Sequence, residues 1–549
     1  MVFFLLVAAG SASCEKGKYW IYFTQKSDNG SLALYRHVEN RLSEHARERR
    51  AKVCRGPFLI DHTDLPVPQH HLSSLKQLNI QPVVISKWLN AVSAFLSPEQ
   101  VPEIEKCPFV SRVVKVQRFA SVPFEYEYVP TSSQLKKHIF DYGASYEQYN
   151  LNSIPAVHDL GYFGQGVRIA LFDTGFRLTH AALQHIKVIA AYDFINHDPV
   201  VDNESGQDEG SQNFHGTAIL SIIGGYLPGQ LVGPAFKAEY LLAKTEDIRS
   251  ETIVEEDNWV AAAEWADSLG ADIISTSLGY TDWYTYDDMD GDTAPITIAA
   301  DLAVKKGILV VVSAGNEGDK LWHYVSAPAD GDSVLSVGAI RSTGTIADFS
   351  SRGPTSDGRL KPEVVAMGIG VLSVTNQSDE LVRISGTSAA CPIIAGVAAM
   401  LLSASPALSP MQVREAIIKT ADRSMNPDNT YGYGVASALQ ALGYWEVPRS
   451  LPESSGGISA FPNPFSWSRH MISRILIDSS VSQSLNMEIY NVLGQKILTV
   501  QDGIQLAGGQ RCFIWDGRDQ SGTRVPVGAY YCRIDLNSFS KTVAITVNH

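Results

Sequence analysis

Apolar runs alternate with helical stretches through the middle of this chain, and that alternation is what most constrains its fold. Four runs predict buried strands, and two stretches between them predict crossover helices. Strands joined by helices form a parallel sheet that is covered on both faces. Functional groups in such a sheet gather beyond the carboxyl ends of the strands. The expected strands are 238–243, 271–277, 308–312 and 334–338, and the expected helices are 260–269 and 297–306.

A serine lies where a glycine turn leads into a run of small residues. Ser388 follows Gly386 and Thr387 and precedes residues 389–400, which predict a helix. Unpaired N–H groups and the positive dipole end at a helix N-terminus favour developing negative charge. A serine is nevertheless a poor nucleophile unless a base takes its proton. The chain must therefore supply a base and a group that orients it.

Two residues can supply those roles. Asp173 ends the apolar run 167–172, which predicts a carboxylate at the C-terminal end of a buried strand, and His215 begins another helical run. Taken singly, each has an ordinary structural explanation as a turn, cap or surface residue. Asp-Thr-Gly is also the fingerprint of aspartic proteases, but those need a second such tripeptide, which the chain lacks. Because the three residues follow one another in the order Asp, His, Ser, it is improbable that all of them are only turn, cap or surface residues.

From these motifs onward, the chain from about Tyr142 to Tyr444 resembles a subtilisin-like serine protease, whose triad has this order. Segments 313–318, 349–354 and 361–364 match the same family. The resemblance implies an α/β fold of three layers, α/β/α, with a mostly parallel sheet. It also implies peptide-bond hydrolysis through an acyl-enzyme, with no cofactor required for the chemistry.

The resemblance assigns roles to individual residues. Asp173, His215 and Ser388 correspond to the catalytic triad, and Asn316 corresponds to a side-chain donor of the oxyanion hole. The resemblance also assigns five residues to substrate binding, where they pair with the backbone of an extended substrate and form the walls of the first specificity pocket. These residues are Ser277, Leu278, Gly279, Ala314 and Gly315.

An acidic loop is a candidate for structural calcium. Four aspartates surround Gly291 at alternating positions, a pattern of oxygen ligands that hard cations favour. The terminal glutamate of a complete calcium loop is missing, and clustered acids on a loop are more often simply solvated. The calcium candidates are Asp287, Asp288, Asp290 and Asp292.

The N-terminal part predicts an export signal and a propeptide. Residues 1–13 resemble the apolar part of a secretion signal. Residues 14–130 predict strands at 18–23 and 110–116, a charged helix at 44–52 and a strand–helix pair at 82–94. This pattern resembles the α+β propeptides of subtilases, which act as chaperone and inhibitor. Arg47, Arg49, Arg50 and Lys52 form a basic cluster that we expect to be a solvated helix face.

A linker and a third domain follow the catalytic region, which we place at 138–445. Residues 446–457 are rich in Pro, Ser and Gly, as linkers are. Residues 458–549 carry short alternating strands separated by turns and resemble immunoglobulin-like β-sandwich domains that serve as type IX secretion sorting signals. The resemblance implies export machinery as a partner and an extracellular or bacterial-surface location.

The composition of the chain limits the classes of partner that it can bind. The formal net charge of −14 over 549 residues leaves no basic footprint for nucleic acid, and we expect a monomer that acts on proteins or peptides. Two disulfide bridges are possible among the six cysteines, Cys54 with Cys107 and Cys512 with Cys532. Cys391 is expected to be a packed thiol.

Two alternatives remain beside a secreted serine endopeptidase made as a zymogen. A sedolisin-like acid peptidase shares the Ser388 motif but uses Glu and Asp partners, and His215 argues against it. The second is an inactive, surface-displayed binding protein on the same scaffold.

Overall fold

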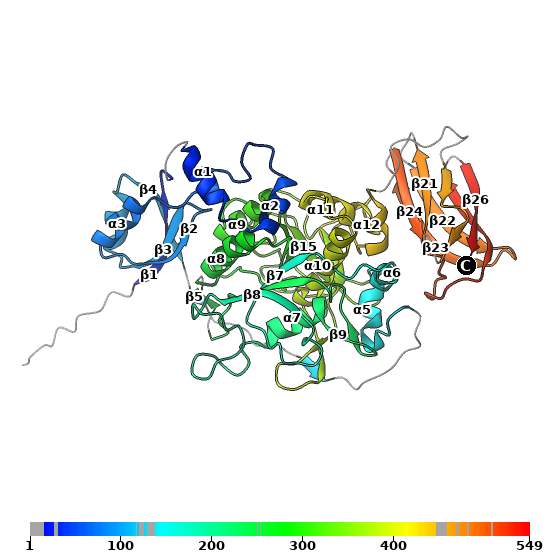
Figure 1. Ribbon diagram of the computed structural model, residues 1–549, viewed down its shortest axis with the longest axis horizontal. Helices are drawn as coiled ribbons and strands as arrows, with labels where there is room; N and C mark the ends of the chain where they lie inside the picture. Colours follow the sequence, from blue (N-terminus) through cyan, green and yellow to red (C-terminus); the bar gives the residue numbers. More distant parts are fainter. Residues whose placement is uncertain are drawn as a thin grey trace, which may run out of the picture.

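The chain forms three successive regions, which a computed structural model shows from left to right in Figure 1. The structure describes residues 16–26, 31–116, 118–119, 126–128, 138–249, 251–252, 254–445, 458–467, 472–479, 483–506, 509–537 and 539–548. The expected signal at 1–13 and the expected linker at 446–457 lie outside the described residues.

The first region is an antiparallel sheet of four strands in the order β2-β3-β1-β4. Alternate residues of a strand point to opposite faces. Tyr19 and Ile21 of β1 therefore pack with α3 and α4, whereas Trp20 and Tyr22 join the core of the second region. The elements are β1 (Gly17–Phe23), α3 (Gln69–Gln77), β2 (Pro82–Ser86), β3 (Ala91–Leu96), α4 (Gln100–Glu105) and β4 (Val110–Val116).

The strand–helix pair expected at 82–94 is wrong, because the structure has a β-hairpin there. Strands β2 and β3 pair antiparallel, and the turn between them ends at Asn90, whose φ of 51° is left-handed. Asparagine tolerates that conformation better than most residues. The β-branched run 83–85 suits a strand, and pairing with β1 fixes the second strand.

An insertion of residues 24–68 between β1 and α3 carries α1 (Leu32–Glu39), α2 (Glu44–Ala51) and the short 3₁₀ helix η1 (His62–Asp64). The Ser43 hydroxyl caps α2 by accepting from the Ala46 backbone N–H. Figure 1 shows α2 lying against α8 (Val254–Leu269) and α9 (Pro295–Lys305) of the second region. Arg49 and Arg50 of α2 are each 1% exposed, so the expectation of a solvated basic face is wrong for these two residues.

The second region has an all-parallel sheet of seven strands in the order β16-β15-β14-β13-β7-β11-β8, which confirms the predicted fold class. Each expected strand is present within one or two residues of its predicted bounds. The strands are β7 (Arg168–Asp173), β8 (Lys187–Asp193), β11 (Glu239–Lys244), β13 (Ile273–Thr276), β14 (Leu309–Ser313), β15 (Leu335–Ile340) and β16 (Val364–Met367).

Helices cover both faces of this sheet. Ile169 and Leu171 of β7 pack with α7 (Phe214–Gly224) and α10 (Thr387–Ala404), whereas Ala170 and Phe172 pack with α8 (Val254–Leu269) and α9 (Pro295–Lys305). Helix α10 is long and apolar enough to cross a membrane by composition, but here it is a buried core helix. Smaller helices are α5 (Tyr146–Asn150), α6 (Ile154–Asp159), α11 (Pro410–Lys419) and α12 (Ala438–Gly443).

The third region consists of two packed sheets, β19-β21-β24 and β20-β26-β25-β22-β23, whose facing side chains share one core. This confirms the expected β-sandwich. The strands are β19 (Ile458–Phe461), β20 (Phe465–Ser466), β21 (Ser473–Ser479), β22 (Gln483–Asn491), β23 (Lys496–Leu506), β24 (Gly509–Trp515), β25 (Gly528–Leu536) and β26 (Phe539–Asn548).

The sandwich is docked on the second region through α12 and α6. Gln440 of α12 bonds the backbone of Ile514 in both directions, at 3.1 and 3.0 Å, and the Ile514 side chain joins the core of the second region. Arg518 forms a buried ion pair with Asp159, which also accepts from His138 Nδ1 at 2.7 Å. The third region is therefore not a detached appendage.

None of the five described cysteines is bridged. Cys54, Cys107, Cys512 and Cys532 are free thiols, so neither open pairing is formed in this structure. Cys391 is a buried thiol, as expected, and burial raises its pKa to about 12.

Candidate active site

The carboxyl edge of the sheet brings two of the predicted triad residues into contact. Asp173 is the last residue of β7, and His215 is the second residue of α7. The Nδ1 atom of His215 lies 2.7 Å from Oδ1 of Asp173, and the carboxylate is almost fully buried. A buried carboxylate on Nδ1 fixes the imidazole tautomer and leaves Nε2 facing away from the aspartate.

The loop after β7 holds that carboxylate in place. Asp173 Oδ1 also accepts from the backbone N–H of Thr174 at 2.8 Å, and the Thr174 hydroxyl accepts from the Gly216 N–H at 3.2 Å. A Cβ on Gly216 would lie 2.2 Å from the carbonyl oxygen of Gly175. Glycine at position 216 therefore lets the first turn of α7 approach the β7 loop closely enough for the contact between His215 and Asp173.

Ser388 is the second residue of α10, at the helix N-terminus that its sequence predicts. Its Oγ is buried and has no hydrogen-bond partner among the described residues. The Ser388 carbonyl accepts from the hydroxyl of Ser277 at 2.9 Å, which fixes the start of α10 against the end of β13.

The position of a Cβ on Gly386 marks a point that three groups of the candidate site approach. A Cβ placed on Gly386 would be 2.8 Å from Ser388 Oγ, 3.6 Å from Asn316 Nδ2 and 3.6 Å from the Ser388 backbone nitrogen. One hydroxyl and two N–H groups thus lie within 4 Å of a single point. A nucleophile and oxyanion donors that converge on one position are the arrangement that acyl transfer requires.

The Asn316 side chain is held in the orientation that presents its amide nitrogen to this point. Its Oδ1 accepts from the Thr387 backbone N–H at 2.9 Å and from the Thr387 hydroxyl at 3.0 Å. Because the carbonyl side of the amide is taken up in this way, Nδ2 faces the space next to Ser388.

The predicted substrate-binding segments face each other across a serine that sequence analysis missed. Ser326 Oγ lies 2.2 Å from the position of a Cβ on Gly279 and 2.9 Å from that of a Cβ on Gly315. The Ser326 N–H bonds the carbonyl of Ala314 at 3.2 Å, and Leu278 accepts from Ser313. The Ser326 hydroxyl is buried without a hydrogen-bond partner in the described part of the chain. No motif identifies it, because only the fold places it between the two glycines.

The four calcium candidates do not converge on one point. Asp288 Oδ2 accepts from Thr285, and Asp290 accepts from the N–H groups of Asp292 and Thr293. Among the described residues, no group of three or more His, Cys, Asp or Glu side chains could hold a metal ion. The calcium site, with Asp287 as its fourth candidate, stays a prediction.

Two short stretches after the first region pair with the second. Strand β5 (Arg118–Phe119) pairs antiparallel with β12 (Glu251–Thr252), just ahead of α8. Strand β6 (Tyr126–Tyr128) pairs antiparallel with β18 (Leu381–Ile384), which itself pairs with β17 (Val371–Val374) and leads to Ser388. Both stretches lie between the first and second regions, in the segment of about 118–138 that we call the processing linker, and each adds a strand to the second region.

Similarity to known proteins shows the family to which this chain belongs. The model of the "Subtilase family" matches residues 164–434, and relatives include Subtilisin DY of Bacillus licheniformis, 33% identical over 284 residues that cover 51% of this chain and 92% of that protein. The chain belongs to the subtilase family. This is a family of serine-type endopeptidases, and the expected enzyme class is confirmed. Subtilisin E of Bacillus subtilis is 30% identical over 360 residues, 65% of this chain and 81% of that protein.

A further relative and two further family models also match the chain. Serine protease AprX of Bacillus subtilis is 31% identical over 307 residues, 51% of this chain and 66% of AprX. The model "Peptidase S8 propeptide domain, Bacteroidota" matches residues 18–132, and "FlgD Ig-like domain" matches residues 474–538. The subtilase thus carries a propeptide, and its third region is immunoglobulin-like, although the matching family is not one of sorting domains.

Proposed function

We propose that this subtilase is a secreted or surface-bound serine endopeptidase, made as a zymogen, that cleaves proteins or peptides as a monomer. The observation that carries the proposal is the convergence of Ser388 Oγ, Asn316 Nδ2 and the Ser388 N–H on one point beside Gly386. The pair of Asp173 and His215, joined at 2.7 Å, supplies the base that such a serine needs.

In the proposed mechanism, His215 Nε2 takes the proton from Ser388 Oγ as that oxygen attacks the scissile carbonyl. Asp173 stays ionised, holds the tautomer and stabilises the imidazolium. The oxyanion of the tetrahedral intermediate accepts from Asn316 Nδ2 and the Ser388 N–H. His215 then returns the proton to the leaving amine. Water next attacks the acyl-enzyme, His215 takes the proton of that water and passes it to Ser388 Oγ, and the acid product leaves.

Extended peptides are the proposed substrates. The segments Ser277–Gly279 and Ala314–Gly315 offer backbone groups to a substrate strand, and recognition through backbone groups is largely independent of sequence. The buried hydroxyl of Ser326 between Gly279 and Gly315 gives the pocket a polar group that a substrate side chain can bind.

The propeptide is the proposed inhibitor, because it packs on α8 and its linker pairs with β12 and β18. Maturation then requires a cut in the linker. We further propose that the immunoglobulin-like region serves export or surface attachment, since it contributes none of the residues around Ser388. Deleting residues 458–549 should change where the protein accumulates in its native host, and unchanged localisation would contradict this role.

A serine-directed fluorophosphonate probe separates the enzyme from its alternative. An active peptidase, once matured, becomes labelled on Ser388, and Ser388→Ala prevents labelling. An inactive binding protein on the same scaffold shows no labelling in either form, provided that the propeptide has been removed.

A further inference from the structure

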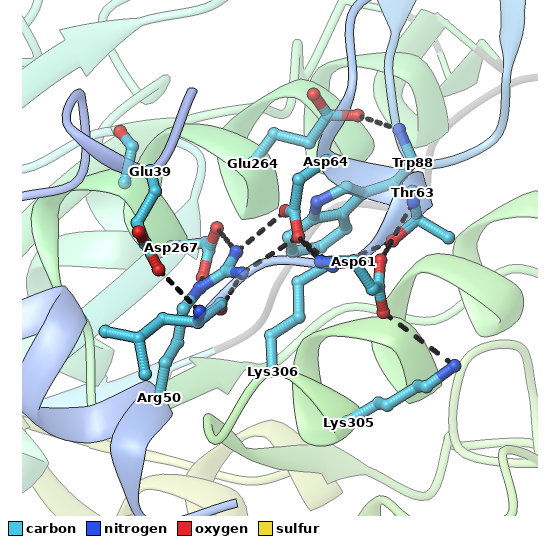
Figure 2. Close-up of polar contacts among 12 residues, drawn as sticks. Glu39, Arg50, Asp61, Thr63, Asp64, Trp88, Glu264, Asp267, Lys305 and Lys306 are labelled. Carbon is cyan, nitrogen blue, oxygen red and sulfur yellow. Dashed lines mark hydrogen bonds and ion pairs between the residues drawn. The ribbon is translucent and has the colours of Figure 1, made fainter. Parts of the chain in front are cut away.

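Residues 31–65, the part of the propeptide insertion 24–68 that carries α1, α2 and η1, meet the catalytic domain at a place remote from the processing linker. Its helix α2 lies across the C-terminal ends of α8 and α9. Figure 2 shows the polar contacts there, with Arg50 between Asp64 of the insertion and Asp267 of α8. The β-sheet of the propeptide makes a separate contact with α8. There the Glu264 carboxylate accepts from the Ser86 hydroxyl and from the Trp88 backbone N–H.

All five N–H donors of Arg50 are used. Its two terminal nitrogens bind both oxygens of Asp64, at 2.9 and 2.8 Å, and one also bonds the Leu59 carbonyl at 3.0 Å. The remaining two N–H groups, on Nε and Nη2, bind the two oxygens of Asp267. Although burial opposes ionisation of Asp64, its bonds to Arg50 hold the pKa of that carboxyl below the usual range. A guanidinium with every donor bound to a carboxylate or carbonyl is held rigidly.

Arg49 caps two helices of the catalytic domain at once. Its Nη1 donates to the Ala271 carbonyl just beyond α8 at 2.7 Å, and its Nε donates to the Lys306 carbonyl at the end of α9 at 3.3 Å. Its Nη2 donates to the backbone and side chain of Asp267. C-terminal carbonyls carry the negative end of the helix dipole, so a buried cation is favoured there.

The catalytic domain is shaped to receive this helix. Gly270, with φ of +89°, ends α8, and a Cβ there would lie 2.7 Å from the Ala46 nitrogen of α2. Gly307, with φ of +95°, ends α9, and a Cβ there would lie 3.2 Å from the Arg49 carbonyl oxygen. Both glycines terminate their helices in the left-handed conformation and also leave room for α2.

A lysine of the catalytic domain completes the contact from the other side. Lys306 Nζ donates to Asp64 at 2.9 Å and to the Thr63 hydroxyl at 2.7 Å, and it is 2% exposed. The carboxylate of Asp64 therefore lies between a propeptide arginine and a catalytic-domain lysine. Charges alternate across the interface, and each one is buried by its partners.

We propose that residues 31–65 are a guanidinium-based anchor, which keeps the propeptide bound to the catalytic domain after the linker has been cut. The binding site on the enzyme consists of Asp267, Lys306 and the carbonyls that end α8 and α9, and its ligand is the Arg49–Arg50 pair. The proposal rests on the zymogen function proposed above. Breaking one partner of a buried, hydrogen-bonded charge pair leaves the other charge desolvated, which mainly speeds dissociation.

The test uses the full chain and does not depend on its own peptidase activity. In the Ser388→Ala protein, residues 131–136 are replaced by the recognition sequence of a site-specific protease, and the protein is tethered through its C-terminus. After the cut, loss of the N-terminal fragment is followed over time. We expect that fragment to leave at least a hundredfold faster when the chain carries Arg50→Gln or Asp267→Asn.

Arg47→Gln is the matched control, because Arg47 lies on the same helix and donates to Asn40 within the insertion. It should leave the dissociation rate within threefold of the unsubstituted chain. Asp267→Asn keeps the shape of the side chain and decides the question alone if Arg50→Gln does not fold before the cut. Rates within threefold for both anchor variants, or equal acceleration by Arg47→Gln, would overturn the proposal. Full peptidase activity of an uncut chain that carries Ser388 would contradict the zymogen function and leave this result unaffected.

Discussion

Thr387 binds the carbonyl oxygen of the Asn316 amide twice, through its backbone N–H at 2.9 Å and through its hydroxyl at 3.0 Å. The residue next to the nucleophile thus determines which way the amide points. The same hydroxyl accepts from the Gly315 N–H at 3.2 Å, which ties the loop after β14 to the start of α10. Orientation of the oxyanion donor and placement of the nucleophile are therefore coupled through one side chain.

Asn316→Ala should lower kcat by about 10²–10³-fold with little change in KM, the effect that loss of the corresponding donor has in subtilisin. Thr387→Val keeps the backbone bond but loses the hydroxyl, and it should lower kcat by about tenfold. Steady-state kinetics on a short peptide measure both. An effect confined to KM would show that Asn316 positions substrate and does not bind the oxyanion.

Ser388→Ala should abolish peptidase activity, a loss of about 10⁶-fold in kcat, while the fold is kept. Alanine fits because Ser388 Oγ makes no hydrogen bond within the described residues, so its removal leaves no partner unpaired. Peptide hydrolysis measures the loss of activity, and circular dichroism of the same preparation checks that the fold is kept. Substantial turnover by folded, uncontaminated protein would refute the nucleophile assignment.

The propeptide should stay attached to the Ser388→Ala chain if the enzyme cuts its own linker. Mass spectrometry of both proteins, produced in a protease-deficient host, gives their N-termini. Wild type should begin within or after the linker, between Phe119 and His138. A cut in the inactive variant would assign processing to another protease.

Arg518→Ala should lower stability by about 3 kcal/mol without changing kcat/KM on a short peptide, because the buried Asp159 carboxylate loses its guanidinium partner and keeps only His138 and the Ile139 N–H. The comparison is Arg533→Ala, on the exposed face of the same domain. Thermal unfolding of the two variants measures the difference. Equal midpoints would mean that docking of the third region does not depend on this ion pair.

Glu256 should make the protein less stable as pH rises from about 4.5 to about 8. Burial raises the pKa of this carboxyl from 4.5 to about 8, so the folded state keeps a proton that the unfolded chain has already lost. Stability then falls on the order of 1 kcal/mol per pH unit in that window.

Glu256→Gln removes the titration and should flatten the dependence of the melting temperature on pH. Both Trp283 and Tyr284 can still donate to the amide oxygen. Glu147→Gln, at an exposed position, should keep the wild-type slope. A slope that Glu256→Gln leaves unchanged would contradict the prediction. Melting the Ser388→Ala chain avoids self-digestion during the measurement.

The sequence predicts the catalytic region well because chemistry and strand burial leave local signals there. Asp173, His215, Asn316 and Ser388 stand in short motifs at the ends of apolar runs. In the structure Asp173 contacts His215, and Asn316 lies near Ser388 beside Gly386. Ser326 has no such signal, since its position between Gly279 and Gly315 depends on contacts far apart in the chain.

The propeptide shows where local patterns fail. Residues 91–96 have no strong strand preference, and pairing with β1 decides their conformation. Arg49 and Arg50 form a charged run, which ordinarily indicates a solvated face. They are buried because Asp64 and Asp267 meet them from segments 14 and 217 residues away in the chain. No pattern within α2 carries that information.

Asp267 belongs to the catalytic domain by position, yet its contacts with Arg49 and Arg50 of α2 explain its carboxylate better than the mature enzyme does. A carboxylate in the last turn of a helix opposes the helix dipole unless a cation lies against it. The protease and its propeptide are therefore a co-adapted pair, and propeptides exchanged between relatives should function only when the ends of α8 and α9 are exchanged with them.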